Sequence, residues 1–570
     1  MAEEVWMLQT KKADFKQIGA RFRIDPVTAR IIRNRGIEGE AAIDRYLNGT
    51  LDDLYDPMLL KDMEHAVSIL CEAVDTGKKI RIVGDYDIDG VCSTYILLQA
   101  FERLGSDVDF EIPDRIKDGY GINESIIEQA HADGVEVILT CDNGISAFHQ
   151  VELAKKYGMT VVITDHHEVP LDGEKEKIPP ADAVIDPKQA DCPYPFPEIC
   201  GAVVAYKLVQ VLYARRGVPQ MEWLDLLEFA AIATVGDVMK LQDENRILVK
   251  YGLKKMAQTK NLGLRRLAEK NNLDLGAITA YHIGFVIGPC LNAGGRLKTA
   301  KEALALLRAQ SEEEAERLAE ELKELNDTRK DMTEQGTEAA KLQVESWYQK
   351  DKVLVVFLPE CHESLAGIIA GRLREYYQKP AIVLTRGEEA VKGSGRSIDG
   401  YHMFKKLTEV SDLLLKFGGH PLAAGLSLEE KNIDEFRRRL NENAGLTEED
   451  FKAKVWIDVP MPVGYVTERL VRELSCLEPF GQGNEKPLFA EKSLRIRASR
   501  VLGRNRNVVK MTLEETDGHA IEALYFGDGT AFEEERAGRR EIDVVYYPDI
   551  NEYNGRKTLQ AVIRRYKFRG

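Results

Sequence analysis

The chain has 570 residues, of which 44% are hydrophobic and 30% are charged, and this balance excludes a disordered or fibrous protein. At this length we expect about three or four domains, each with its own core. The net charge of −16 argues against an indiscriminate polyanion binder. A local basic groove remains compatible with it, because binding follows the local field rather than the total charge.

The first residues and the cysteines indicate the compartment. Residues 1–4 carry acids where a signal peptide carries bases, and no apolar run reaches the roughly 18 residues that a membrane span needs. We therefore expect a cytoplasmic protein that makes no membrane contact. None of the eight cysteines forms a Cys-x-x-Cys pair, which predicts free thiols rather than a disulfide framework or a zinc knuckle.

In chain order, residues 1–50 come first and contain two short helical patterns, 26–35 and 38–47, without a chemical cluster. We expect a helical appendage here. Apolar residues at helical spacing over residues 62–76 then predict an amphipathic helix that leads into the first strand.

Three acids follow the first predicted strand. The β-branched run at residues 80–83 predicts a buried parallel strand, and Asp85, Asp87 and Asp89 come next at alternate positions, before Gly90 turns the chain. Ligands of such sheets bind in the crevice beyond the carboxyl ends of the strands. Three acids crowded there would resist ionisation unless a cation lay among them, so this stretch indicates a divalent metal site.

Two other interpretations of these acids stay open at this point. Asp-rich strand ends are often solvated turns or helix caps. Residues 87–91 also resemble the nucleophile motif of haloacid dehalogenase-type phosphatases. The segments further along the chain have to decide between the three.

The next segments repeat the pattern of the first strand. After the strand at 80–83, apolar runs follow at residues 108–113, 135–140, 160–164 and 183–185. Helix-length stretches separate these strands, and residues 92–103 are the first of them. Strands that alternate with helices predict a doubly wound parallel sheet, and therefore an α/β fold class.

Further polar residues follow the same strands. Asp142 comes after the strand at 135–140, and His166 and His167 come after the strand at 160–164. Because parallel strands end at one edge of the sheet, we expect these side chains to converge with the three acids. Asp237 follows an apolar helix at residues 223–235, where a cap and a metal ligand are equally good interpretations. The phosphatase alternative leaves the two histidines unexplained.

Mixed carboxylate and imidazole ligands suit Mn²⁺, with Mg²⁺ as the competitor. A pair of divalent ions is a standard arrangement for the hydrolysis of phosphate esters. Asp142 lies between the other groups in chain order and is our choice for the carboxylate that bridges the ions. The residues alone therefore predict a phosphoesterase.

Four of these segments carry a family resemblance. Residues 84–90, 141–144, 165–167 and 236–237 resemble, in order and spacing, the signature motifs of the DHH phosphoesterase superfamily, and most closely those of its RecJ exonucleases. The resemblance covers roughly residues 50–570. It implies two bound metal ions, Mn²⁺ or Mg²⁺. The implied ligands are Asp85 and Asp87 for one ion, Asp89, His166 and Asp237 for the other, and Asp142 as the bridge. The division of the first three acids stays open. His167 would act beside the metals, either on the substrate phosphate or as a hydrogen-bond partner that holds a metal ligand.

A fifth segment, residues 288–297, resembles the family's glycine-rich fifth motif, although Gly294 stands where alanine is common. We expect a flexible turn here, on which Arg296 wraps a phosphate with backbone and guanidinium donors. A plain tight turn is the alternative.

Ser311 opens a long charged helix with a capping-box pattern, and the helical spacing continues towards Trp347. We expect this helix to connect two domains. A coiled-coil partner site is less favoured, because the heptad pattern is short and Gly336 interrupts it.

A second α/β unit follows, with strands at residues 353–358 and 381–384 and a helix at residues 364–377. The glycine-rich segments 393–397 and 417–425 resemble the DHHA1 domain of the same family. As turns that hold Ser, Arg and His, they suit an anion. Ser364 stands where relatives often have glycine.

The resemblance to RecJ exonucleases also implies a site for the 5′ phosphate and backbone of a DNA strand. Its implied residues are Arg115, Tyr120, Asn292, Arg296, Ser394, Arg396 and His420. The implied catalytic groups are Asp142, His166, His167 and His420, with His420 near the scissile phosphate.

From residue 453 onward, β-type alternation and a final strand pair at 542–547 and 558–565 predict a small barrel of the oligonucleotide-binding (OB) type. Six basic residues lie between positions 494 and 510 without an acid among them: Arg495, Arg497, Arg500, Arg504, Arg506 and Lys510. With Tyr546, Tyr547 and Tyr553 as stacking platforms, they indicate a groove for a phosphate backbone. A solvated β-face is the alternative, and RecJ proteins carry such a barrel in this place.

The expected architecture is α/β: a DHH-type doubly wound parallel sheet, a long connecting helix, a DHHA1 α/β domain and a C-terminal OB-like β-barrel. The expected limits are 1–50 for the appendage, 51–310 for the DHH domain, 311–348 for the connecting helix, 349–452 for the DHHA1 domain and 453–570 for the OB domain.

The resemblance implies a single-stranded-DNA-specific 5′→3′ exonuclease that releases 5′ mononucleotides in DNA repair and recombination. It also implies single-stranded DNA, a single-strand-binding protein and a RecQ-type helicase as partners. Two alternatives stay open. One is a DHH-family phosphodiesterase for oligonucleotides or cyclic dinucleotides, and the other is a non-catalytic DNA-replication scaffold of the same superfamily.

Overall fold

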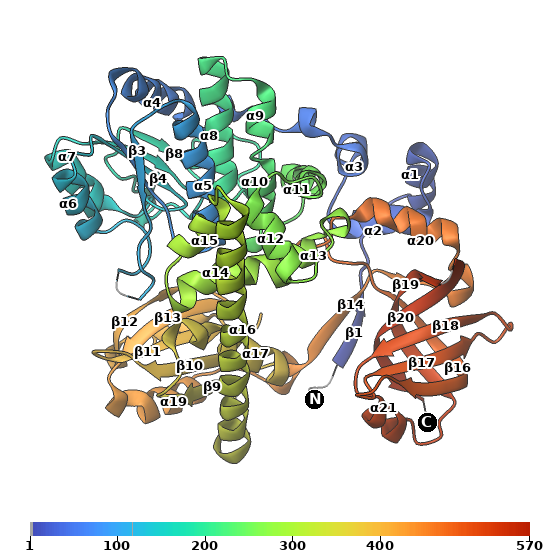
Figure 1. Ribbon diagram of the computed structural model, residues 1–570. Helices are drawn as coiled ribbons and strands as arrows, with labels where there is room; N and C mark the ends of the chain where they lie inside the picture. Colours follow the sequence, from blue (N-terminus) through green and yellow to red (C-terminus); the bar gives the residue numbers. More distant parts are fainter. Residues whose placement is uncertain (1–3, 117, 554, 570) are drawn as a thin grey trace. The chain divides into compact units, whose positions relative to one another are not determined.

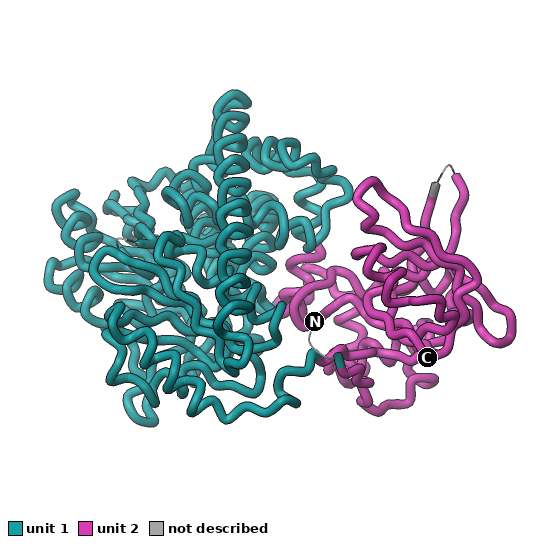
Figure 2. Tube along the Cα trace, turned by 90° about the horizontal axis from the view of Figure 1, so that it is seen from below, with its two compact units in different colours: residues 1–4, 55–239, 251–453 teal, residues 5–54, 240–250, 454–570 magenta. Residues whose placement is uncertain are grey.

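The computed structural model describes residues 4–116, 118–553 and 555–569, and the fold divides into two compact units (Figures 1 and 2). Unit 1 comprises residues 1–4, 55–239 and 251–453, and unit 2 comprises residues 5–54, 240–250 and 454–570. Both units are therefore assembled from segments that are far apart in the sequence.

The first sheet of unit 1 is parallel throughout, as predicted, with the strand order β3-β2-β4-β5-β8. The strands are β2 (Ile80–Val83), β3 (Val108–Glu111), β4 (Val137–Cys141), β5 (Thr160–Thr164) and β8 (Ala183–Ile185). Thr140 pairs with Val83 on one side and with Ile163 on the other, so the carboxyl ends of β2, β4 and β5 are level.

Helices pack on both faces of this sheet. Two of them, α6 (Glu124–Ala132) and α7 (Phe148–Lys156), share a hydrophobic core with β4 and β5. Three others, α4 (Met63–Thr76), α5 (Ile88–Arg103) and α8 (Gly201–Arg216), pack together and against the sheet (Figure 1). A small hairpin, β6 (Leu171–Asp172) and β7 (Lys175–Glu176), follows β5.

The start of α5 differs from the prediction. The helix begins at Ile88 instead of Cys92, because the Asp87 side chain accepts the backbone N–H groups of Asp89 and Gly90 and so caps it. Gly90 therefore does not turn the chain, and Asp89 lies in the first turn of the helix.

The helical part of unit 1 continues after α8. Its helices are α9 (Gln220–Leu224), α10 (Leu227–Gly236), α11 (Asp243–Met256, shared with unit 2), α12 (Leu262–Lys270), α13 (Ala280–His282), the π-helix η4 (Ile283–Ile287), α14 (Gly288–Leu297) and α15 (Lys301–Leu307). The single helix predicted at 223–235 is thus two helices.

The fifth motif is a helix, α14, so the prediction of a glycine-rich turn at residues 288–297 is wrong. The glycines serve close packing here. A side chain on Gly295 would place its Cβ 2.3 Å from the Tyr86 carbonyl oxygen, so only glycine lets α14 approach the loop that follows β2.

The long predicted helix is α16 (Glu312–Gln343), followed by the π-helix η5 (Val344–Tyr348). Ser311 caps it by accepting the backbone N–H of Glu314. The helix continues through Gly336. The helix packs on α12, α14 and α15 and also on α17 and β9, so it joins the two sheets of unit 1.

The second sheet has the order β12-β13-β11-β10-β9. Its strands contribute to two separate hydrophobic cores. Its strands are β9 (Leu354–Phe357), β10 (Ala381–Arg386), β11 (Val391–Arg396), β12 (Leu414–Gly419) and β13 (Ala423–Leu428), and its helices are α17 (Glu363–Tyr377), α18 (Met403–Thr408) and α19 (Ile433–Glu442). Both glycine-rich segments predicted as turns lie mainly in strands, and only residues 420–422 of the second turn the chain.

Unit 2 is built around the predicted barrel. Its strands are β15 (Val459–Pro460), β16 (Phe489–Leu502), β17 (Val508–Glu514), β18 (Ala520–Phe526), β19 (Glu541–Tyr553) and β20 (Arg556–Phe568), with helices α20 (Glu468–Leu474) and α21 (Gly529–Arg536). The order is β15-β16-β17-β18-β20-β19, and a further pairing of β16 with β19 closes the barrel.

The N-terminal segment belongs to the same unit. It forms β1 (Glu4–Leu8), which pairs with β14 (Ala453–Ile457), and the helices α1 (Phe15–Phe22), α2 (Pro26–Asn34) and α3 (Glu40–Asn48). Ile31, Ile32 and Ile43 pack into the core of the barrel. All eight cysteines are free, as predicted. Among the described residues, no helix combines the length and the apolar character that a membrane crossing needs.

Candidate metal centre and nucleic-acid surface

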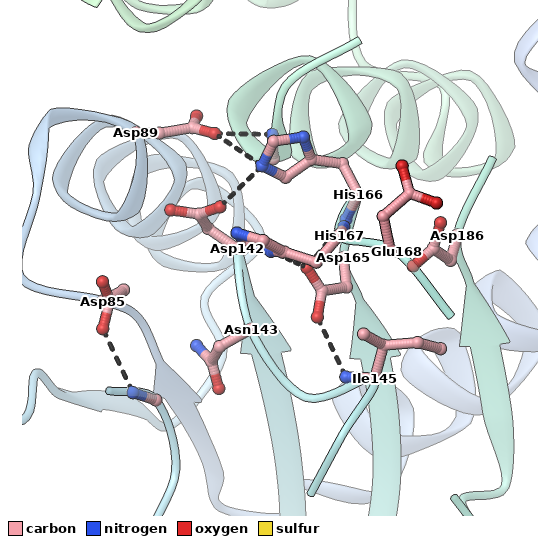
Figure 3. Close-up of polar contacts among 12 residues, drawn as sticks. Asp85, Asp89, Asp142, Asn143, Ile145, Asp165, His166, His167, Glu168 and Asp186 are labelled. Carbon is pink, nitrogen blue, oxygen red and sulfur yellow. Dashed lines mark hydrogen bonds and ion pairs between the residues drawn. The ribbon is translucent and has the colours of Figure 1, made fainter. Parts of the chain in front are cut away.

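Acidic and imidazole side chains meet at the carboxyl edge of the first sheet (Figure 3). Asp85 follows β2, Asp142 follows β4, and His166 follows β5, and all three are buried. The level ends of these strands bring together residues that are far apart in the sequence.

His166 is the centre of this cluster. Its Nε2 lies 3.1 Å from Asp142 Oδ1, 3.5 Å from Asp89 Oδ2 and 3.8 Å from Asp237 Oδ2. One ligand atom from each of Asp89, His166 and Asp237 lies within 4.8 Å of the others, and the same holds for Asp142, His166 and His167. Such a set of hard oxygens with an imidazole matches the ligands that Mn²⁺ accepts.

Asp89 is fixed by the start of α8. Its two carboxylate oxygens accept the backbone N–H groups of Gly201 and Ala202, each at 2.7 Å. A carboxylate is a favourable partner for a helix N-terminus, so the start of α8 fixes the position of this side chain. A side chain on Gly201 would place its Cβ 2.7 Å from the Asp142 Cβ, which only glycine avoids.

Two residues of the cluster lie in or beside strained backbone. Asp142 has φ +61°, and Val238, which follows Asp237, has φ +58°. The left-handed region is unusual for a residue with a side chain, and for β-branched valine it is a genuine outlier. Strain of this kind concentrates at functional sites, where the surrounding structure holds it in place.

The carboxylates repel one another. Burial, reinforced by the charge of Asp87, raises the pKa of Asp85 to about 8, and burial with the charge of Asp89 raises the pKa of Asp237 to about 8. Burial and the neighbouring carboxylates hold the pKa of Asp142 well above its usual value, and burial lowers the pKa of His166. These acids can ionise together only beside a cation, so the cluster fits a divalent metal.

Asp85 and Asp87 are held by other contacts. Asp85 accepts the backbone N–H of Gly121 at 3.2 Å, while Asp87 caps α5. Within the described residues, neither of them belongs to a group of three ligands. The geometry therefore defines one ion position around His166 more sharply than a second position beside Asp85.

His167 is held by a residue that sequence reasoning did not assign to the site. Its Nδ1 lies 2.7 Å from the Oδ1 of Asp165, whose other carboxylate oxygen accepts the backbone N–H of Ile145. Burial opposes the charge of His167, but the hydrogen bond and the charge of Asp165 outweigh it and raise the pKa of His167 to about 9. The Tyr120 hydroxyl lies 3.0 Å from the same ring nitrogen and donates to the Asp142 carbonyl at 2.8 Å.

Asn143 is a second residue that was missed. Its amide nitrogen donates to the carbonyls of Val83 and Cys141, and its Oδ1 accepts the backbone N–H of Ile122. It thereby ties the ends of β2 and β4 together. The only sequence signal for Asn143 and Asp165 was their place inside the matched motifs.

Arginines form a second cluster in unit 1. Burial and the charges of Arg115 and Arg329 lower the pKa of Arg296 to about 10. Burial likewise lowers the pKa of Arg396, with Arg374 and Arg115 contributing. Arg296 donates to the Ser364 carbonyl at 2.9 Å. Guanidinium groups that repel one another in a partly buried place fit an anion such as phosphate.

For the other predicted phosphate ligands, the structure gives fewer contacts with this cluster. Arg115 lies over the Tyr86 ring at 4.7 Å, and Ser394 lies two residues before Arg396 on β11. Asn292, on α14, has a buried Oδ1 without a partner among the described residues. His420 is exposed in the turn between β12 and β13, and no contact within residues 4–116, 118–553 and 555–569 joins its ring to the metal cluster.

The barrel changes part of the predicted DNA groove. Tyr546 and Tyr547 are buried, so they cannot stack on bases, and that prediction is wrong. The side chain of Tyr553 lies outside the described part of the chain. Of the six basic residues, Arg497 pairs with Glu514 at 2.9 Å and Lys510 pairs with Glu522 at 2.8 Å. Neighbouring strands thus supply acids to a stripe that is purely basic in the sequence.

Comparisons with known families match three parts of the chain. Residues 79–234 match the N-terminal domain of the DHH family, residues 350–445 match the DHHA1 domain, and residues 457–565 match the RecJ OB domain. These ranges contain the metal cluster up to His167, the strand that carries Ser394 and Arg396, and the barrel.

Relatives match along nearly the whole chain. The single-stranded-DNA-specific exonuclease RecJ of Bacillus subtilis is 36% identical over 564 residues, covering 98% of this chain and 70% of that protein. RecJ of Haemophilus influenzae is 33% identical over 568 residues, covering 96% and 97%. The crystal structure of Thermus thermophilus RecJ in complex with Mn²⁺ matches with a TM-score of 0.84 and 28% identity, covering 99% and 79%.

Proposed function

The chain belongs to the RecJ family of single-stranded-DNA-specific exonucleases, and on this premise we propose that it hydrolyses single-stranded DNA from the 5′ end to mononucleotides with divalent metal ions. The observation that carries this proposal is the convergence of three carboxylates on the Nε2 of His166. A helix cap or a solvated turn would not bring acids from three separate elements to one buried imidazole nitrogen, so the geometry argues against both of these interpretations.

We assign the metal ligands from this geometry. Asp89, His166 and Asp237 would hold one ion, Asp85 and Asp87 would face a second, and Asp142 would bridge them. When bound, Mn²⁺ or Mg²⁺ supplies the positive charge that activates water and stabilises the leaving oxygen.

Other residues of the chain act on the substrate directly. His167, kept charged by Asp165, is placed to donate a proton or a hydrogen bond to a phosphate oxygen, and the Tyr120 hydroxyl orients its ring. His420 is assigned here to the neighbourhood of the scissile phosphate, on the strength of the motif alone.

The arginine cluster sets the polarity in this proposal. The residues assigned to the 5′ phosphate and backbone are Arg115, Tyr120, Asn292, Arg296, Ser394 and Arg396. Support comes from the mutual repulsion of the guanidiniums, which a phosphate would relieve. A strand anchored by its 5′ phosphate presents only its first bonds to the metal cluster, so degradation proceeds from that end.

Digestion of labelled DNA tests the function. Single-stranded and duplex DNA carrying a 5′ label are incubated with Mn²⁺, Mg²⁺ or a chelator. We expect labelled mononucleotides from the single strand alone, and only with metal. Labelled fragments that shorten progressively from their 3′ ends, or equal cleavage of the duplex, would contradict the proposal.

Asp142→Asn tests the ligand assignment. The exchange removes the charge that bridges the ions but keeps the shape of the side chain, so we expect cleavage to fall by more than about 100-fold, beyond the loss typical of outer-shell partners of a metal. DNA binding should stay within about twofold. Asp172→Asn, in the exposed β6 strand, is the matched control and should cleave as the wild type does. Full Mn²⁺-dependent cleavage by Asp142→Asn would refute the assignment.

We also propose the cellular setting that the family resemblance supports. The chain would act in the cytoplasm in DNA repair and recombination, together with a single-strand-binding protein and a RecQ-type helicase. Co-purification of the full-length chain with each of these proteins, with and without single-stranded DNA, tests the partners.

A further inference from the structure

An exposed pair of aromatic rings lies at the start of the helical segment that carries Arg296. Tyr281 and Phe285 are 62% and 67% exposed, and their rings stack with centroids 4.7 Å apart and planes 28° apart. Aromatic rings carry much of the apolar area that proteins bury. Two of them stacked in solvent form an apolar surface suited to a flat ligand.

The backbone explains why these rings stack. Residues 280–297 run through α13, the π-helix η4 and α14, with helical dihedral angles at each junction. Residues four positions apart lie on the same face of a helix, so the side chains of Tyr281 and Phe285 are neighbours. Ile283 and Ile287 are buried, so the rings occupy the opposite, solvent-facing side.

The same segment contacts residues that stand next to the metal ligands in the sequence. Ile88, which stands between Asp87 and Asp89, packs against Gly288 at the start of α14. One turn earlier, Gly284 lies against Val235, two residues before Asp237. Further along, α14 carries Asn292 and then Arg296. The segment therefore runs from the rings, past these neighbours of the metal ligands, to Arg296.

We propose that Tyr281 and Phe285 form a stacking platform for bases of the substrate strand on the 3′ side of the bond that is cleaved. This inference rests on the proposed function, because Arg296 must hold the 5′ phosphate for the strand to run from it, past the metal ligands, to the rings. The bases that reach the rings belong to nucleotides that are still to be removed. Every base has a flat face, so the platform is tolerant of sequence and retains the strand between successive cleavages.

Binding measurements with the full-length chain in chelator test the platform without any cleavage. The probe is a 5′-phosphorylated thymidine strand in which one abasic nucleotide is moved position by position, and Kd is measured by fluorescence anisotropy. For the wild type we expect Kd to rise about tenfold when the abasic nucleotide lies at the rings. The Tyr281→Ala/Phe285→Ala variant should bind the intact strand about tenfold more weakly and lose its sensitivity to that abasic position.

The inference is overturned if the double variant binds as the wild type does, or if its loss of affinity is the same for every abasic position. Phe285→Trp keeps a flat ring and should retain the position-dependent effect, whereas Phe285→Leu keeps an apolar side chain without a ring face and should lose it. Trp347→Ala removes another exposed ring, 70% accessible on η5, and should leave every Kd unchanged.

Addition of Mn²⁺ to the wild type separates this inference from the proposed function. Suppose that the wild type releases mononucleotides, but the abasic position changes Kd equally in the wild type and in the ring variant. The platform is then refuted and the nuclease function stands. If Kd depends on the abasic position as expected but the wild type releases no nucleotide, the rings bind bases of the strand and the nuclease function is refuted.

Discussion

Arg296 is a partly buried guanidinium with other guanidiniums nearby. Burial together with the charges of Arg115 and Arg329 lowers its pKa to about 10. Its Nη1 donates to the Ser364 carbonyl, which brings α14 and the start of α17 together. A phosphate between these arginines would replace repulsion with charge-assisted hydrogen bonds, so phosphate binding should stabilise the folded chain.

Arg296→Gln should therefore remove the preference for a 5′ phosphate. We expect kcat/KM on 5′-phosphorylated DNA to fall by about 30-fold or more, because the loss of one partner of a buried charged pair costs about 2 kcal/mol or more. The rate on DNA with a 5′ hydroxyl should change little. The measurement is the ratio of kcat/KM for the two substrates, in the wild type and the variant.

A control variant and a measurement of phosphate binding test this prediction further. Arg317→Gln removes a charge from an exposed position of α16, 60% accessible, and should leave the ratio unchanged. Inorganic phosphate should raise the melting temperature of the wild type but not that of Arg296→Gln. An equal ratio in wild type and Arg296→Gln would show that this arginine does not read the 5′ end.

At the residue scale, the sequence predicted the groups that end strands and missed the groups that hold them. Asp142 and His166 follow apolar runs, so the topology of a parallel sheet alone brings them together. Asp165 and Asn143 act through hydrogen bonds to backbone groups of other strands and loops, which no spacing reveals. Tyr546 failed as a stacking residue for a similar reason, because the alternation of a barrel strand does not say which face is inside.

At the scale of elements, two wrong predictions came from glycine. The glycines of α14 and β11 were interpreted as turns, since glycine is the usual residue of tight turns. In the structure both segments have regular backbone, and glycine serves to bring two elements close together, as Gly295 does beside Tyr86. Close approach depends on a partner that is distant in the sequence, so local pattern cannot distinguish the two uses.

One buried acid makes the stability of α10 depend on pH. Glu228 is 3% exposed, its Oε1 accepts the Thr259 hydroxyl at 2.7 Å, and its Oε2 has no partner among the described residues. Burial raises its pKa to about 7 from a usual value of 4.5. Between these pH values the folded chain holds a proton that the unfolded chain has lost, so the free energy of unfolding falls as the pH rises.

Glu228→Gln should remove this dependence. The variant has nothing to ionise, so we expect it to be more stable than the wild type by up to about 3 kcal/mol above pH 7, and to lose that advantage as the pH falls towards 4.5. Melting temperatures of both proteins across this range measure the difference. Glu128→Gln, an exposed position of α6, should track the wild type at every pH. A Glu228→Gln advantage that is constant with pH would show that packing, not ionisation, is responsible.

At the scale of the whole molecule, the sequence did not indicate which segments fold together. Residues 5–54, which we expected as a separate appendage, belong to the same unit as the barrel (Figure 2). Ile31, Ile32 and Ile43 from the helices of this segment pack into the barrel core. Arg246, from the middle of the chain, is buried in the same unit and donates to the carbonyls of Tyr46, Cys476 and Leu477. These partners are 200 or more positions away from Arg246, and composition gives no sign of the pairing.

The net charge of −16 raises the question of how this molecule attracts a polyanion. Repulsion by the whole acidic surface is screened beyond about 8 Å at physiological ionic strength, so a local basic stripe dominates at close range. Part of the predicted stripe on the barrel is neutralised by Glu514 and Glu522. Within residues 4–116, 118–553 and 555–569, Arg495, Arg500 and Arg504 make no ion pair, and all three are exposed. These arginines are therefore available to phosphates.

Replacing Arg495, Arg500 and Arg504 together with alanine should weaken the binding of a long single strand and reduce its dependence on salt. Each phosphate of a single strand that an arginine neutralises adds about 0.7 to the slope of log K against log salt, so we expect the magnitude of the slope to decrease by about 2. Replacing Lys12, Lys16 and Lys175, which are exposed and carry the same charge, tests whether net charge alone has the effect. If both triple variants show the same decrease in affinity and slope, DNA is attracted by total charge, and the barrel is not the surface that the strand follows.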